Sequence, residues 1–113
     1  MKSILMLALI VGLSACGIVN GQSSKKTISI QTNAQCGECK ERIEEKLNYT
    51  KGVVYGELDL DTKIVEVKYN SSKLSGEEVK KVISDLGYNA DEVKADPKAQ
   101  SELPKCCQPG GHD

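Results

Sequence analysis

Apolar residues recur along residues 27–48 with two different periods. Residues 27–33 alternate apolar and polar positions, which is the period of a strand with one buried face. From Cys39 to Asn48 the period becomes helical, and charged residues cover the remaining positions. The alternating apolar positions are Ile28 and Ile30, and the helical ones are Cys39, Ile43 and Leu47. The pattern predicts a strand followed by a helix, with a loop between them.

The second half of the pattern predicts a hairpin, a helix and a short last strand. The predicted strands are residues 53–60, 64–69 and, more weakly, 88–93, with a tight turn at 61–63. Ser75 is a candidate helix N-cap, because Glu78 follows three residues later as in a capping box. The helix should end at Gly87, since glycine is favoured just after a helix.

The order strand, helix, strand, strand, helix, strand predicts an α+β fold of the ferredoxin-like βαββαβ type. This fold has a four-stranded antiparallel sheet with two helices on one face. The predicted core consists of Ile28, Ile30, Ile43, Leu47, Val53, Leu58, Leu60, Val65, Val67, Val79, Val82, Ile83 and Leu86.

The first 26 residues read as a targeting segment and a tether. Lys2 precedes an apolar run of about ten residues, too short to span a bilayer. Leu13-Ser14-Ala15-Cys16 resembles the lipobox of bacterial lipoproteins, which implies cleavage after residue 15 and acylation of Cys16. Residues 16–26 would then form a flexible tether. We therefore expect a cell-envelope protein, lipid-anchored to a bacterial membrane and facing the periplasm or the exterior; ordinary cleavage nearby is the alternative.

Cys36 and Cys39 form a CxxC motif at the junction between the first predicted strand and the first predicted helix. The unpaired N–H groups of a helix start favour thiolates there. A thiolate pair suits soft ions such as Cu(I) and Hg(II), whereas Zn(II) would want four ligands. A redox-active pair, a structural disulfide and two independent buried cysteines are the alternatives.

This arrangement resembles the heavy-metal-associated domain family over about residues 26–94, and we assign the domain to 27–94. Asn33-Ala34-Gln35-Cys36-Gly37-Glu38-Cys39 stands where the family has Gly-Met-x-Cys-x-x-Cys, and Leu86-Gly87-Tyr88 matches after the second helix. The resemblance implies Cys36 and Cys39 as ligands, with Tyr88 near the metal. It also implies reversible carriage of the ion to a partner with its own cysteines. Ala34 fills less volume than the family methionine, so we expect a looser loop or a neighbour that fills the space.

Residues 95–113, the C-terminal tail, hold further soft ligands. The tail has three Pro, two Gly and no apolar periodicity, which is typical of a mobile polar segment. Cys106, Cys107 and His112 could form a second soft site, or join Cys36 and Cys39 in a three- or four-ligand site. A disulfide with the loop and spare thiols are the alternatives.

Composition narrows the function further. A formal charge of −1 offers no basic face for nucleic acid, and four Tyr without Phe or Trp offer no stacking platform. No acid/base pair is identifiable, so we expect no enzymatic activity.

The leading hypothesis is a membrane-anchored, extracytoplasmic chaperone or buffer for Cu(I), or for Hg(II) or Zn(II). It would serve a heavy-metal transporter or other acceptor, and a metal-bridged homodimer is compatible with it. The alternative is a thiol-disulfide oxidoreductase or redox-sensing lipoprotein that uses the same CxxC.

Overall fold

The computed structural model describes residues 24–109. The predictions for residues 1–23, with Cys16, and for His112 lie outside these residues. The elements in chain order are β1 (Lys25–Gln31), α2 (Gly37–Asn48), β2 (Val53–Asp59), β3 (Ile64–Asn70), α3 (Gly76–Leu86), α4 (Pro97–Ser101) and the single 3-10 turn η2 (Lys105–Cys107).

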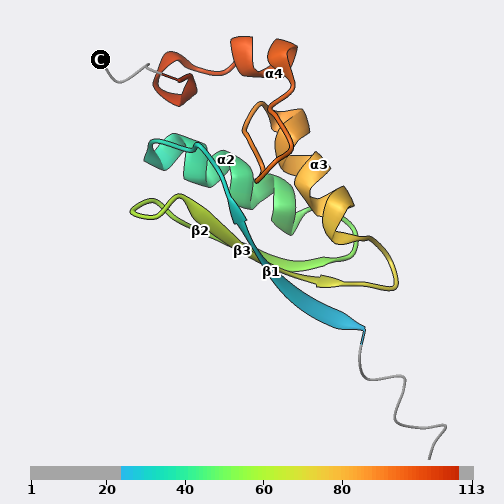
Figure 1. Cartoon of the computed structure of the whole chain (residues 1–113). Coiled ribbons are helices and arrows are strands. Elements are labelled where there is room, and N and C mark those ends of the chain that lie inside the picture. The colour runs from blue at the N-terminus through green and yellow to red at the C-terminus, as the bar shows by residue number, and fades with distance from the viewer. Residues whose placement is uncertain (1–23, 110–113) are drawn as a thin grey trace, which may run out of the picture.

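The three strands form one antiparallel sheet in the order β1-β3-β2, and both long helices lie on the same side of it (Figure 1). Ile30 pairs with Val65, and Leu58 pairs with the same residue from the other side. All three side chains are buried, so the alternation predicted from the sequence places its apolar face against the helices. The predicted core is confirmed in its centre, whereas Ile28, Val53, Leu60, Val82 and Leu86 are only partly buried.

Both helices begin and end close to where the sequence predicted. Cys36 is the N-cap of α2, which buries Cys39, Ile43 and Leu47 along one stripe. Ser75 and Glu78 form the predicted capping box at the start of α3. Gly87 ends α3 in the left-handed conformation, with φ of 107°, a conformation that glycine adopts without steric cost.

The predicted fourth strand is not formed, so the four-stranded sheet is wrong for the described residues. Residues 88–93 make a turn closed by an isolated bridge between Ala90 and Val93. Asp91 has a φ of 54°, which reverses the chain and prevents it from running extended beside β1. The segment still docks at the end of β1, where the Asp91 N–H donates to the Gln31 carbonyl at 2.9 Å. Asp91 favours this turn over a strand, because aspartate tolerates the left-handed conformation better than most residues do.

The tail is folded as far as residue 109, contrary to the expected mobile segment. Asp96 caps α4 by accepting a hydrogen bond from the Ala99 N–H at 3.0 Å. Leu103 is buried in the same apolar cluster as Ile43 and Ala34. One buried leucine and one capped turn thus hold a segment that has no helical periodicity over a longer window. Figure 1 shows the tail folded back over the N-terminal end of α2.

Gly56 in β2 marks a close contact between this strand and α2. A Cβ there would lie 2.7 Å from Leu47 Cδ1. The irregularity of the strand lies nearby, between Val53 and Tyr55. The glycine therefore lets α2 approach the sheet closely.

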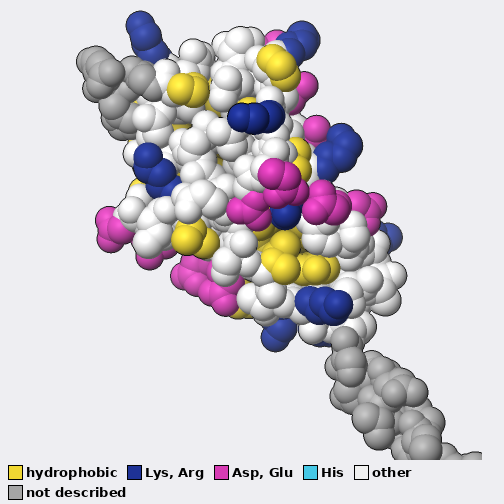
Figure 2. Space-filling model, viewed as in Figure 1, with side chains coloured by type: hydrophobic (Ala, Val, Ile, Leu, Met, Phe, Trp, Pro, Cys, Tyr) yellow, Lys and Arg dark blue, Asp and Glu magenta, His cyan; other side chains and the backbone are white. Residues whose placement is uncertain are grey.

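Charged side chains of both signs are interspersed over the face shown in Figure 2, and neither sign forms a continuous stripe there. Within residues 24–109, no helix is both long and apolar enough to cross a membrane.

Gly87 should be intolerant of any side chain. A Cβ there would lie 2.8 Å from the Gln100 nitrogen and 2.9 Å from its Cα, both in the backbone of the tail. Together with the left-handed φ, this contact predicts that Gly87→Ala destabilises the fold by about 2 kcal/mol or more. Thermal unfolding of the reduced protein measures the loss. Gly37→Ala is the matched control, because a Cβ at Gly37 meets nothing within 4 Å; equal stability of the two variants would contradict the packing described.

Candidate metal centre

The first turn of α2 brings Cys36 and Cys39 together. Cys36 is in extended conformation just before the helix, and Cys39 is fully buried one turn later. Their Sγ atoms lie 3.2 Å apart. Both thiols thus converge on one point at the positive end of the helix dipole, where thiolates are favoured.

The loop before the CxxC motif is held on both sides. Thr32 Oγ1 donates to the Lys63 carbonyl at 2.8 Å and accepts from the Ala34 N–H at 3.1 Å. The Asn33 side chain accepts a hydrogen bond from the Asn89 N–H at 2.9 Å. Asn33, a departure from the family pattern, therefore ties the loop to the segment after α3. Ala34 is fully buried in the cluster that contains Leu103 and Cys107, so tail residues complete the packing around the smaller side chain.

The tail places two more thiols beside the CxxC pair. Cys36 Sγ lies 3.3 Å from Cys106 Sγ and 3.7 Å from Cys107 Sγ. The two tail sulfurs are 3.9 Å apart, although adjacent side chains of an extended chain would point apart. The 3-10 turn η2 turns them to the same side. Cys36, Cys106 and Cys107 form a group whose sulfurs are all within 4.8 Å of one another. The tail and the CxxC loop, separate in sequence, thus make one cluster of four free thiols.

Two glutamines, which the sequence analysis did not single out, hold the tail in place. Gln35 Nε2 donates to the Gln108 carbonyl at 2.6 Å and joins the loop to the tail. Gln108 Nε2 donates to the Leu103 carbonyl at 2.7 Å, which closes the turn around the two cysteines. Isolated polar residues carry no periodic signal. Only their positions could have drawn attention to them, because Gln35 directly precedes the CxxC motif and Gln108 directly follows Cys107.

The four thiols differ in acidity. Partial burial raises the pKa of Cys36, but hydrogen bonding with Cys39, Cys106 and Cys107 outweighs it and lowers that pKa to about 6. Cys106 donates to the Glu38 carboxylate at 3.1 Å, and this bond to an anion raises the pKa of Cys106 to about 11. Burial raises the pKa of Cys107 above its ordinary value. Cys36 is therefore more acidic than either tail thiol, and Glu38 accepts a hydrogen bond from Cys106 in addition to lying at the helix start.

Tyr88 lies beneath the cluster. Its ring is fully buried, and its hydroxyl has no hydrogen-bond partner among the described residues. Burial and the neighbouring Cys107 and Cys39 thiols raise the pKa of Tyr88 well above its ordinary value, so the hydroxyl keeps its proton. A buried donor without an acceptor is costly. It gains an acceptor when a neighbouring sulfur becomes a thiolate.

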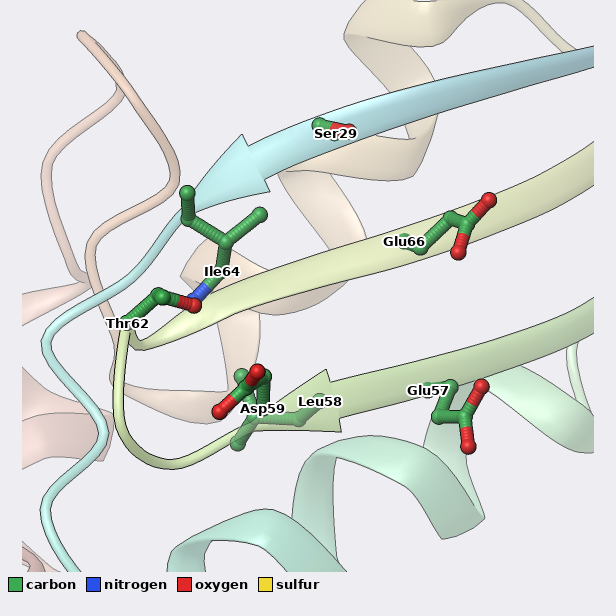
Figure 3. Close-up of a pocket in the computed structure, with 7 residues that line it drawn as sticks. All are labelled: Ser29, Glu57, Leu58, Asp59, Thr62, Ile64 and Glu66. Atoms are coloured by element: carbon green, nitrogen blue, oxygen red, sulfur yellow. The ribbon is translucent and has the colours of Figure 1, made fainter.

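A hollow lies elsewhere, on the face of the sheet away from the helices (Figure 3). It measures about 520 Å³ and is lined by Glu57, Glu66, Asp59 and Ser29, among others. Figure 3 shows the side chains of Glu57 and Glu66 on neighbouring strands, and these residues are paired in the sheet. The hollow is lined by no thiol or imidazole, whereas the sulfur cluster gathers four thiols of residues 24–109.

Comparison with protein families agrees with this geometry. The profile of the heavy-metal-associated domain matches residues 30–89, a range that includes the CxxC motif and Tyr88. The chain belongs to the heavy-metal-associated domain family. This membership confirms the resemblance seen in the sequence, and it agrees with the expectation of a metal-binding module without enzymatic activity.

Among curated proteins, the chain is similar to copper proteins of staphylococci. It is 39% identical over 54 residues to the copper chaperone CopZ of Staphylococcus aureus (strain bovine RF122 / ET3-1), covering 48% of this chain and 79% of that protein. It is 40% identical over 70 residues to a copper-exporting P-type ATPase of Staphylococcus epidermidis (strain ATCC 35984). That match covers 62% of this chain but only 9% of the ATPase.

Solved structures support the same fold. A structure of a CopZ metallochaperone superposes with a TM-score of 0.55 at 30% identity, covering 57% of this chain and 98% of that chain. Oxidized MerP from Ralstonia metallidurans CH34 gives a TM-score of 0.57 at 19% identity, which supports the fold alone. That match covers 59% of this chain and 94% of the MerP chain. The profile and both structural matches leave a large part of this chain uncovered, and the profile ends before the tail begins.

The acidity of Cys36 can be tested on the reduced, metal-free protein. Because its pKa is lowered to about 6, alkylation of Cys36 by iodoacetamide should rise with pH through a midpoint near 6. Cys106 should remain slow to react until well above neutral pH. Mass-spectrometric mapping of alkylated peptides measures both. Cys106→Ser removes one thiol that hydrogen-bonds Cys36 and should move the midpoint upward. A midpoint near 8.5 in the parent protein would contradict the described hydrogen bonding.

Proposed function

We propose that this protein is a membrane-anchored Cu(I) chaperone or buffer that works outside the cytoplasm. The observation that carries the proposal is the CxxC thiol pair at the start of α2, with Sγ atoms 3.2 Å apart, in a chain similar to copper chaperones. Thiolate ligands prefer soft ions, and Cu(I) is satisfied by two or three of them. Hg(II) and Zn(II) are the less favoured cargoes, although tail thiols raise the number of sulfurs available to them.

The position of the thiols also supports attachment through the N-terminus. The N-terminal end of β1 lies far from the N-terminal end of α2 and from the tail that folds over it, which carry the four thiols (Figure 1). A lipid on Cys16 would therefore leave the thiols facing away from the membrane, where a soluble or membrane partner can reach them. We propose a heavy-metal transporter or another thiol-bearing acceptor as that partner, in keeping with the similarity to part of a copper-exporting ATPase.

The thiol-disulfide oxidoreductase hypothesis has one observation in its favour. The pKa of Cys36 is about 6 and two further thiols lie within 3.7 Å, so an attacking thiolate and resolving thiols are present. Metal binding and disulfide exchange use the same atoms, and solution measurements must separate them.

Cu(I) binding is the decisive test of the proposed function. The reduced protein, titrated with Cu(I) under a competing chelator without oxygen, should bind it tightly. Cys36→Ser removes the sulfur closest to the other three and should weaken binding by more than about 100-fold, beyond the 10–100-fold typical of residues that only orient ligands.

Ser84→Ala is a control in the same domain, since Ser84 donates to the Lys94 carbonyl far from the thiols. It should bind Cu(I) like the parent. A protein that binds no Cu(I) but reduces insulin disulfides would be an oxidoreductase, contrary to the proposal.

The proposed anchor predicts where the protein fractionates. The parent chain expressed in a bacterium should be recovered with membranes and carry a lipid mass on Cys16. Cys16→Ser should abolish lipid attachment, and the processed, lipid-bearing protein should disappear from the membrane fraction. Fractionation followed by mass spectrometry measures both. A parent chain that is recovered without lipid would contradict the anchor, whatever its affinity for Cu(I).

A further inference from the structure

The four sulfurs are arranged around Cys36. Its Sγ lies 3.2 Å from Cys39, 3.3 Å from Cys106 and 3.7 Å from Cys107. Cys36, Cys106 and Cys107 are mutually within 4.8 Å, and Cys39 stands outside that group. The cluster thus consists of a pair and a trio that share one sulfur.

This shape does not suit one ion bound by all four sulfurs. A tetrahedral site with metal–sulfur bonds of about 2.3 Å needs every pair of sulfurs to be about 3.8 Å apart. The Cys39 sulfur lies more than 4.8 Å from at least one of the two tail sulfurs, so the four sulfurs do not have tetrahedral spacing. Two ions of low coordination number fit better, because Cu(I) accepts two or three sulfurs and a thiolate has lone pairs for two soft cations.

We propose that the cluster holds two Cu(I) ions bridged by the Cys36 thiolate. Cys36 and Cys39 bind one ion, and Cys36 binds the second together with Cys106 and Cys107. This inference rests on the proposed function, and it extends the site beyond residues 30–89, the range that the family profile covers. Any thiol that still carries a proton releases it to solvent on binding, as thiolate ligation requires.

Charge and burial favour the second ion. Cys39 is fully buried and Cys107 is only 2% exposed, so water reaches these sulfurs poorly. Four thiolates around one Cu(I) would carry a net charge of −3, and a second Cu(I) reduces it to −2. Uncompensated charge is costly where water is excluded. The second cation therefore stabilises the thiolate form of the pocket.

Tyr88 supplies a second observation, a buried donor that anionic sulfurs would satisfy. Its buried hydroxyl lacks an acceptor among the described residues and faces Cys39 and Cys107, one thiol from the pair and one from the trio. When these thiols become thiolates, the hydroxyl can donate to one of them. Such outer hydrogen bonds commonly support metal-bound ligands.

The number of ions per chain tests the proposal. The reduced full chain, with Cys16→Ser in every sample to remove the fifth thiol, is loaded with Cu(I) without oxygen and examined by native mass spectrometry. We expect monomers with two Cu(I). Cys106→Ser combined with Cys107→Ser should bind one. Lys105→Ala combined with Pro109→Ala changes exposed residues on either side of the pair and should still bind two.

X-ray absorption should show a copper–copper scattering path in the two-copper protein and none in the one-copper variant. No bound copper would overturn the proposed function itself. One ion per parent chain would overturn only the two-ion site. Two ions in the double serine variant, two ions without the copper–copper path, or a second ion seen only in dimers would each overturn the shared Cys36 bridge.

Discussion

The close packing of Gly87 against the tail backbone is the contact on which the sulfur cluster depends. A left-handed glycine ends α3 and leaves no room for a side chain between it and Gln100. From there the chain runs over the N-terminal end of α2, and Leu103 fixes it in the apolar cluster. This tight reversal sends the chain back toward the CxxC loop, where Leu103, Gln35 and Gln108 hold the two tail cysteines. The steric fit between Gly87 and the tail backbone therefore helps to determine where the tail thiols lie.

The start of α2 then sets the acidity of those thiols. The helix end favours negative charge, and hydrogen bonding with the neighbouring thiols lowers the pKa of Cys36, so Cys36 ionises before the two tail thiols. Glu38 and burial keep the tail thiols protonated in the metal-free protein. A thiolate at Cys36 consequently lies beside two protonated tail thiols and not beside two further anions. A soft cation replaces the protons and their hydrogen bonds together.

The sequence was informative where the signal is local and periodic. Alternation around Ile30 and Val65, the Ser75–Glu78 capping box and Gly87 predicted strands, helix ends and the buried face correctly. It failed at residues 88–93, where a single left-handed residue, Asp91, outweighed a weak strand propensity. It also failed for the tail, because one buried leucine and two glutamine hydrogen bonds leave no periodic pattern. The sequence indicated Cys36, Cys39, Cys106 and Cys107 as candidate ligands. Their convergence depends on tertiary contacts of the tail, which the spacing of the cysteines does not predict.

Because all four sulfurs belong to one chain, their mutual concentration is fixed by covalent connection and not by how much protein is present. Ligands joined by a short connection meet at an effective concentration of about millimolar. Each molecule therefore has the complete set of four sulfurs at low protein concentration as well as at high concentration. Dilution leaves the capacity of each molecule unchanged.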